Sequence, residues 1–206
     1  NGGINSGKGN ENTIGSITTS KAIEEARKDD KVKAIVLRVN SGGGSALASD
    51  VIWRETILAK NEKPLVVSFG DVAASGGYYI ACAADKIIAN PTSITGSIGV
   101  FGMIPNMSEF YKSNFGITFD TVKTNNYADM GTNRKLTSFE KQKIQQGVEE
   151  VYTTFISKVS DGRGISTKQV DEIGQGRVWT GLRAKQINLI DSIGGLKDAI
   201  KIASEL

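Results

Sequence analysis

The feature of this sequence that most limits its fold is an alternation of helical and buried-strand patterns in the first half. Helical patterns at Ser20–Lys28 and Ala46–Lys60 alternate with apolar runs at Lys33–Val39 and Pro64–Phe69, and a further short run covers Lys86–Ala89. Short apolar runs rich in Val and Ile are typical of buried strands. Alternating strands and helices predict a mostly parallel sheet with right-handed crossovers and peripheral helices. We therefore expect an α/β fold built from βαβ units.

The second half of the sequence is predicted to be mainly helical. Thr137–Glu140 has the form of a capping box, and an apolar stripe continues from it to Val159, which predicts one long helix. Shorter elements are expected elsewhere: helices at Ser108–Ser113, Ser166–Ile173, Gly181–Ile187 and Lys197–Ser204, and a strand at Thr118–Lys123.

Length and composition fit one globular domain. The chain has 206 residues, of which 39% are hydrophobic and 23% charged, and this is enough for a substantial core. Residues 1–13 are rich in Gly, Asn and Ser, so we expect a flexible lead-in there and a single domain over 14–206. No run reaches the roughly 18 apolar residues of a membrane span. Because the chain opens on Asn1 rather than Met, we expect a fragment without the part that precedes it.

Charge, cysteine and histidine content exclude several functional classes. The net charge is only +3 and its charges are interleaved, so we predict no nucleic-acid partner. Cys82 is the one cysteine, and its apolar surroundings predict a buried structural thiol. The chain has no histidine, which excludes a Ser-His-Asp triad and any His-ligated metal. The Gly42–Gly44 run lacks the pattern of a phosphate loop, and we predict no cofactor.

Two glycine-rich segments follow predicted strands, at Ser41–Ser45 and Ser75–Gly77. In a parallel sheet both lie at carboxyl ends of strands, where clefts form, and glycine lets backbone N–H groups approach a ligand closely. Either segment by itself is more often a turn. Together they combine the hydroxyl of Ser75 with two N–H groups, which are the parts needed for acyl transfer. Without histidine, the general base would most plausibly be a lysine.

Five motifs, in this order, closely resemble the signal peptide peptidase A family of serine proteases, especially its short single-domain bacterial form. They are Asn40–Ser45, Ala74–Tyr79, Ala83–Ile87, Gly96–Val100, and Arg177–Gly181 with Ala184. The resemblance implies a Clp-protease/crotonase-like fold, with 14–206 as the catalytic domain and a Ser/Lys dyad. It also implies a ring-shaped homo-oligomer, an N-terminal membrane anchor absent here, and a catalytic domain on the extracytoplasmic face of the membrane. The implied substrates are remnant signal peptides and other apolar, unstructured peptides.

The resemblance also assigns roles to individual residues. Ser75 is the expected nucleophile, Gly43 and Gly76 the expected oxyanion N–H donors, and Ser97 the hydroxyl that orients the lysine ammonium. Gly42 stands where the family usually has proline, which should loosen the turn and leave the N–H of Gly43 in place.

The expected general-base lysine is missing, because Ala128 occupies its position. A serine hydroxyl needs a proton acceptor at neutral pH, so we expect this chain to be essentially inactive. We favour an inactivating Lys→Ala replacement. A naturally inactive relative and a different base, Lys123 or Lys135, remain open.

Two other functions are compatible with the same patterns. One is a crotonase-like acyl-CoA enzyme, which would use two backbone N–H groups to hold an enolate, and the other is a non-catalytic peptide-binding module. We expect Trp53 and Trp179 to pack in the core or at a subunit interface. Tyr78 and Tyr79 begin a helix beside Ser75, where core packing and, for one of them, a place in the lining of the cleft both stay open.

Overall fold

The computed structural model describes residues 1–206 and divides them into two compact units. The sheet unit comprises 1–99 and 152–206, and the helical unit comprises 100–151. The single catalytic domain over 14–206 stays a prediction, because a division into compact units does not test it.

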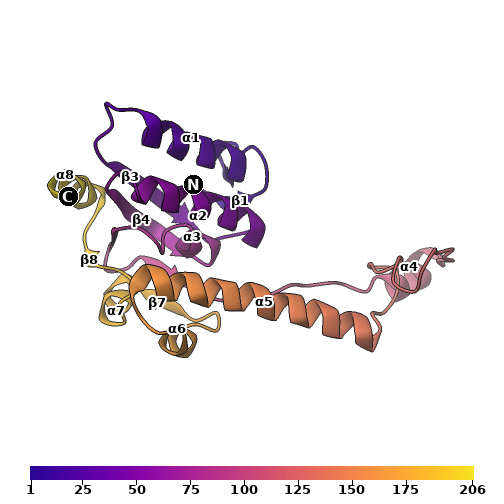
Figure 1. Ribbon diagram of the computed structural model, residues 1–206. Helices are drawn as coiled ribbons and strands as arrows, with labels where there is room; N and C mark the ends of the chain where they lie inside the picture. Colours follow the sequence, from indigo (N-terminus) through magenta and orange to yellow (C-terminus); the bar gives the residue numbers. More distant parts are fainter. The chain divides into compact units, whose positions relative to one another are not determined.

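The sheet unit is built on a six-stranded, mostly parallel sheet (Figure 1). Its strand order is β7-β6-β4-β5-β8, and β3 pairs with the other side of β4. All pairs are parallel except β6 with β7. The α/β fold with a mostly parallel sheet is therefore confirmed, and it is consistent with a Clp-protease-like architecture. The strands are β3 (Ile35–Ser41), β4 (Leu65–Ala74), β5 (Lys86–Ala89), β6 (Ile94–Gly96), β7 (Val178–Thr180) and β8 (Ser192–Ile193).

Helices cover both faces of this sheet because the central strand β4 is buried on both sides. Leu65, Val67 and Phe69 of β4 belong to the main core, which includes residues of α1 (Ser16–Lys28), α2 (Ala46–Lys60) and α3 (Gly76–Tyr79). Val66 points the other way, into a smaller cluster with residues of α8 (Leu196–Glu205). Figure 1 shows α8 on one side of the sheet and α1 and α2 on the other. This alternation follows from the two-residue period of a strand.

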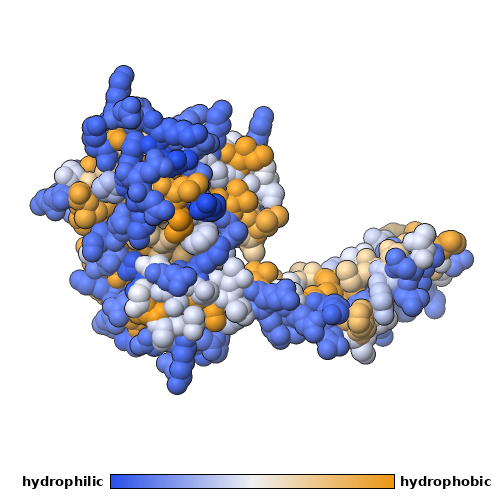
Figure 2. Space-filling model, viewed as in Figure 1, coloured by the Kyte–Doolittle hydropathy of each residue, from blue (hydrophilic) through white to orange (hydrophobic).

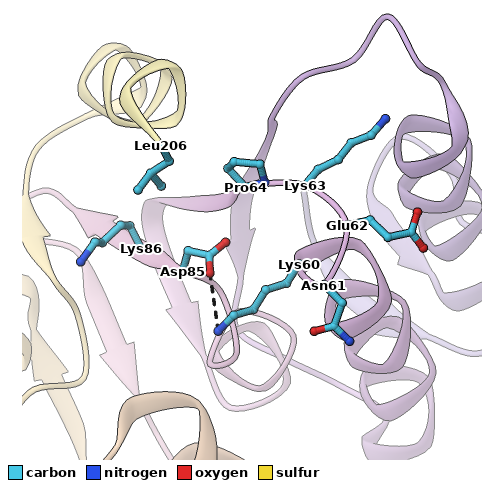
Figure 3. A pocket seen from close by; sticks show the side chains of 8 residues that line it. All are labelled: Lys60, Asn61, Glu62, Lys63, Pro64, Asp85, Lys86 and Leu206. Atoms are coloured by element: carbon cyan, nitrogen blue, oxygen red, sulfur yellow. Dashed lines mark ion pairs between the residues drawn. The ribbon is translucent and has the colours of Figure 1, made fainter.

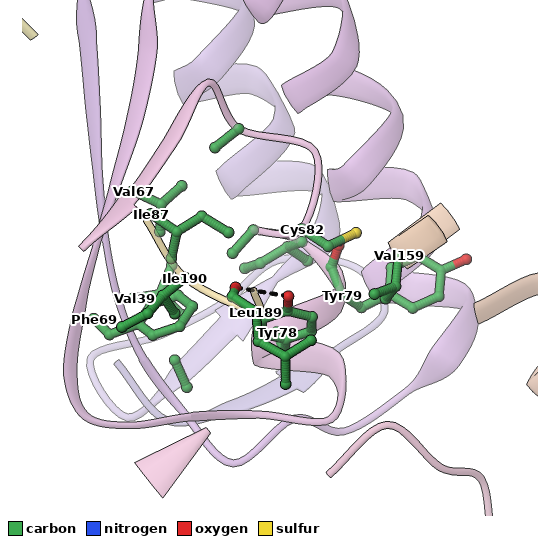
Figure 4. Close-up of a cluster of buried hydrophobic side chains, with 14 of the residues drawn as sticks. Val39, Val67, Phe69, Tyr78, Tyr79, Cys82, Ile87, Val159, Leu189 and Ile190 are labelled. Atoms are coloured by element: carbon green, nitrogen blue, oxygen red, sulfur yellow. Dashed lines mark hydrogen bonds between the residues drawn. The ribbon is translucent and has the colours of Figure 1, made fainter. Parts of the chain in front are cut away.

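The main core contains the short helix α3 and the chain that follows it (Figure 4). The Tyr78 ring is fully buried, lies edge-on to Phe69 at a centroid distance of 6.2 Å, and its hydroxyl donates to the carbonyl of Leu189 (2.8 Å). Cys82 is fully buried as well, and burial raises its pKa to about 12. The prediction of a buried structural thiol is thus confirmed.

The long helix starts at the predicted capping box and spans both units. It is α5 (Ser138–Arg163), and the side chains of Thr137 and Glu140 bond each other's backbone N–H groups. The smaller helices are α4 (Ser108–Phe115) in the helical unit and α6 (Thr167–Ile173) and α7 (Gly181–Gln186) in the sheet unit. None of the helices combines the length and apolar character needed to cross a bilayer.

Two sequence-based expectations differ from the structure. The lead-in over 1–13 is partly ordered: β1 (Gly3–Asn5) pairs with β2 (Thr13–Gly15), and Ile4 is fully buried. A single apolar residue in a polar stretch is enough to dock a strand when its backbone finds partners. The strand predicted at Thr118–Lys123 is absent, because the helical unit contains no strand with which it could pair.

Candidate active site

Strand register brings the carboxyl ends of β3, β4 and β6 together at one edge of the sheet. Ser41 of β3 lies opposite Ala73 of β4, and Ala74 of β4 lies opposite Gly96 of β6. The segments that follow these three strands are therefore neighbours. They carry Gly43, Ser75 and Ser97 respectively.

Ser75 occupies a strained turn between β4 and α3. Its backbone has φ 51° and ψ −121°, a region that L-residues rarely adopt. The turn is held by two backbone hydrogen bonds, from the Ser75 N–H to the carbonyl of Gly96 (2.9 Å) and from the Tyr79 N–H to the carbonyl of Ser75 (2.8 Å). The side chain is half-buried. Such strain is found where the surrounding structure over-determines a functional position.

The glycine loop after β3 lies directly against this turn. A Cβ atom on Gly43 would lie 2.6 Å from the backbone nitrogen of Gly76 and 2.9 Å from the Cβ of Ser75. Gly43 also has φ +98°, so both the space and the backbone angle require glycine. The structure therefore brings Gly43, Ser75 and Gly76 together, as the sequence predicted.

The N–H of Gly43 already has a partner in the structure. It donates to the buried hydroxyl of Ser41, at 3.1 Å. An oxyanion at this site would have to share or replace that bond. Ser41 belongs to the glycine motif, and no role was predicted for it, although a serine two residues before a glycine N–H is a common turn pattern.

Ser97 follows β6 and is also in a strained conformation. It has φ 48°, and its N–H donates to the carbonyl of Arg177 (2.7 Å). Because Ala74 is paired with Gly96, Ser75 and Ser97 are the next residues of adjacent strands.

Ala128 belongs to the helical unit, in an exposed turn. Its N–H lies 3.4 Å from the carbonyl of Asn125, and the neighbouring Tyr127 ring stacks on Phe139 of α5 at a centroid distance of 4.6 Å. A methyl group cannot accept a proton, so residue 128 supplies no base.

A charge network fixes the chain on the other side of Ala128. Arg134 donates to Asp129 (2.8 Å) and to Glu140 (2.6 Å), which is almost fully buried. The hydrogen bonds from Arg134 lower the pKa of both carboxyl groups, that of Glu140 to about 2. Both acids thus act in structural ion pairs.

The two alternative base candidates are placed differently. The Lys123 ammonium donates to Asp129 (3.1 Å) and to the carbonyl of Asn126 (3.3 Å). Lys135 is exposed to solvent. A lysine base needs a desolvated environment, and neither environment is of this kind.

A hollow of the sheet unit lies at the opposite edge of the sheet (Figure 3). It has a volume of about 510 Å³ and includes Pro64 and Lys86, at the amino ends of β4 and β5. Its lining includes an ion pair, between the Lys60 ammonium and a carboxylate oxygen of Asp85 (3.7 Å). Since Ser75 follows the carboxyl end of β4, this hollow is separate from the candidate site.

A parallel sheet with a strained serine beside two glycine N–H groups has the parts of a serine hydrolase. A family model described as Peptidase family S49 matches residues 57–206. The chain therefore belongs to peptidase family S49.

Named relatives agree with this assignment. The chain is 46% identical to "Protease 4" of Salmonella typhi and 42% identical to "Protease 4" of Haemophilus influenzae. Both matches cover the whole of this chain and 33% of the relative. It is 37% identical to "Putative signal peptide peptidase SppA" of Enterococcus faecium, over 89% of this chain and 53% of that protein. The chain thus spans about a third of the length of the Protease 4 relatives.

Proposed function

We propose that this chain carries the nucleophile of a serine endopeptidase, and that Ser75 is that nucleophile. The observation that carries the proposal is the strained backbone of Ser75, packed against the loop of Gly43. The membership in peptidase family S49 supports the same reaction class.

The proposed mechanism is acyl transfer. A neutral lysine amine takes the proton of the Ser75 hydroxyl, and Oγ attacks the peptide carbonyl carbon. The N–H groups of Gly43 and Gly76 stabilise the oxyanion, the protonated amine gives its proton to the leaving nitrogen, and the C–N bond breaks. Water then hydrolyses the ester. Ser97 orients the ammonium.

We propose that this chain by itself is inactive because residue 128 offers no proton acceptor. A replaced lysine at position 128 is the interpretation that we favour. Since the chain spans a third of the Protease 4 relatives, a lysine from outside this sequence is a further possible source of the base. In either case Ser75 lacks only an amine.

The experiment supplies that amine in two ways. We expect Ala128→Lys to gain hydrolysis of an unstructured apolar peptide and reaction of Ser75 with a fluorophosphonate. We also expect a short primary amine in the buffer to give this chain weak hydrolysis that rises with pH. Ser75→Ala in the same background is the matched control. Should neither amine produce hydrolysis that depends on Ser75, the endopeptidase proposal fails.

A peptide-binding role without catalysis is the second candidate, and the observation that favours it is Ala128 itself. It predicts that apolar peptides bind, that the glycine loop contacts them, and that neither amine source causes cleavage. The crotonase-like alternative predicts acyl-CoA binding, which a titration tests directly.

For the substrates and location we propose remnant signal peptides and similar apolar peptides, cleaved at the extracytoplasmic face of the membrane. The name of the Enterococcus faecium relative supports this substrate class.

We also propose a homo-oligomeric ring. Its support is a set of exposed apolar side chains in the helical unit, where Phe101, Met103 and Val122 are 94%, 85% and 103% exposed. Figure 2 shows apolar side chains among polar ones on this unit. Exposed apolar side chains mark interaction sites where they gather in patches. A sedimentation-velocity experiment that finds only monomers at micromolar concentration would remove this proposal.

A further inference from the structure

The N-terminal strand β1 is paired with the loop that carries Gly43. The N–H of Gly2 donates to the carbonyl of Asn40 (3.0 Å), and the N–H of Ile4 donates to the carbonyl of Gly43 (2.9 Å). In return, the N–H of Ser45 donates to the carbonyl of Ile4 (2.8 Å). These three bonds tie β1, which belongs to a separate two-stranded sheet with β2, to the glycine loop through an isolated parallel bridge between Ile4 and Gly44.

Ile4 anchors this strand in the main core. Its side chain is fully buried, whereas Gly3 and Asn5 on either side of it are exposed. The loop is adapted to its presence, because a Cβ atom on Gly44 would lie 2.2 Å from the carbonyl oxygen of Ile4. Close backbone approach of this kind is possible only with glycine.

The peptide groups of Gly43 are therefore held from two sides. Its carbonyl is held by Ile4, its N–H by the Ser41 hydroxyl, and its Cα packs against Gly76. Three consecutive glycines have more backbone freedom than any other tripeptide. Without the bonds to β1, the loop around Gly43 keeps only the bond from its N–H to Ser41 and the close contact with Gly76.

We propose that Ile4 is a positioning residue, which acts through β1 to hold the glycine loop, and with it the Gly43 backbone, beside Ser75. The catalytic part of this inference rests on the proposed function, whereas the ordering of the loop by β1 does not. Precise placement matters because an oxyanion donor works only within hydrogen-bond distance of the developing charge.

The first measurement is amide hydrogen exchange of Ile4, Gly43 and Ser45, which needs no activity. We expect Ile4→Ala to speed exchange at Ser45 at least tenfold relative to the parent, because its acceptor on β1 is released. The matched control is Ile88→Ala, which removes the same atoms from an equally buried isoleucine in the smaller cluster on the other face of the sheet. We expect it to leave loop exchange unchanged. Ile4→Val, which keeps most of the anchor, should restore exchange to near the parent rate and remains informative if Ile4→Ala folds poorly.

The second measurement is the rate at which a fluorophosphonate phosphonylates Ser75, with loss of fluoride, in the Ala128→Lys background. We expect Ile4→Ala to lower this rate, and the kcat for a peptide, at least tenfold with little change in KM, and Ile88→Ala to lower neither. Unchanged exchange at Ser45 in Ile4→Ala, or faster exchange with a full rate of phosphonylation, overturns the inference. Absence of phosphonylation in every protein, the Ala128→Lys parent included, overturns the proposed function instead, and exchange then decides whether β1 orders the loop.

Discussion

Replacing Ser75 by glycine should make the protein more stable than replacing it by alanine. At φ 51° and ψ −121°, an L-residue stores about 1–3 kcal/mol of backbone strain, which glycine relieves. Glycine loses more entropy on folding, at a cost of about 0.5–1 kcal/mol. It also gives up a half-buried Cβ, worth less than about 0.8 kcal/mol. The difference leaves Ser75→Gly close to 1 kcal/mol more stable than Ser75→Ala.

The assay is urea unfolding followed by tryptophan fluorescence. Both tryptophans, Trp53 and Trp179, lie in the sheet unit, so the signal reports on the unit that contains Ser75. For a chain of this size, 1 kcal/mol also corresponds to about 2–4 °C in Tm. Both variants lose the hydroxyl and with it any Ser75 chemistry, so they differ only in the Cβ methyl group and in the backbone freedom that follows from it. A Ser75→Gly protein no more stable than Ser75→Ala would refute the assignment of strain to this turn.

Three further predictions concern other parts of the molecule. Gly43→Ala should lower the free energy of unfolding by at least about 2 kcal/mol and abolish Ser75 labelling, because its Cβ would lie 2.6 Å from a backbone nitrogen of α3. Gly42→Ala is the control, since a Cβ there meets nothing within 4 Å. It should change the free energy of unfolding by less than about 0.5 kcal/mol in the same urea titration. Because the folded-state pKa of Glu140 is lowered to about 2, its stabilising contribution should be complete above pH 4.5 and be lost as the pH falls towards 2. An NMR titration of the Glu140 carboxyl group should find that low midpoint, and Arg134→Gln should raise it. Cys82, buried and with its pKa raised to about 12, should resist iodoacetamide at pH 8 in the folded protein and react fast in urea; rapid labelling of the folded protein would contradict its burial.

Most of the fold could be predicted because the elements of the sheet unit carry strong local patterns. Helix α2 has the predicted bounds, Ala46–Lys60, since Ser45 caps it and its apolar residues recur with helical spacing. Strand β5 also has the predicted bounds, Lys86–Ala89. The short strands β6, β7 and β8 were not predicted, because two or three residues have no periodicity of their own and become strands only through pairing.

Some features of the candidate site could be predicted from the sequence, and others could not. Ser75, Gly76 and Gly43 were predicted as a group from their motifs, and the structure brings them together; their catalytic roles stay predictions. The contact of Gly43 with Ser41 and with Ile4 was not predicted, and Ile4 was assigned to a flexible segment. Nothing local marks a single isoleucine among Gly, Asn and Ser as a core residue.

The amino-acid sequence alone therefore determined the α/β class, the absence of a histidine base and the candidate serine. These features depend only on residue types and on the spacing of residues close together in the sequence. Only the tertiary structure decided that β3, β4 and β6 end at the same edge, that Ser75 is strained, and that the N-terminal strand holds the glycine loop. These features depend on pairing between segments tens of residues apart, so the contacts that stabilise them form only when the chain folds.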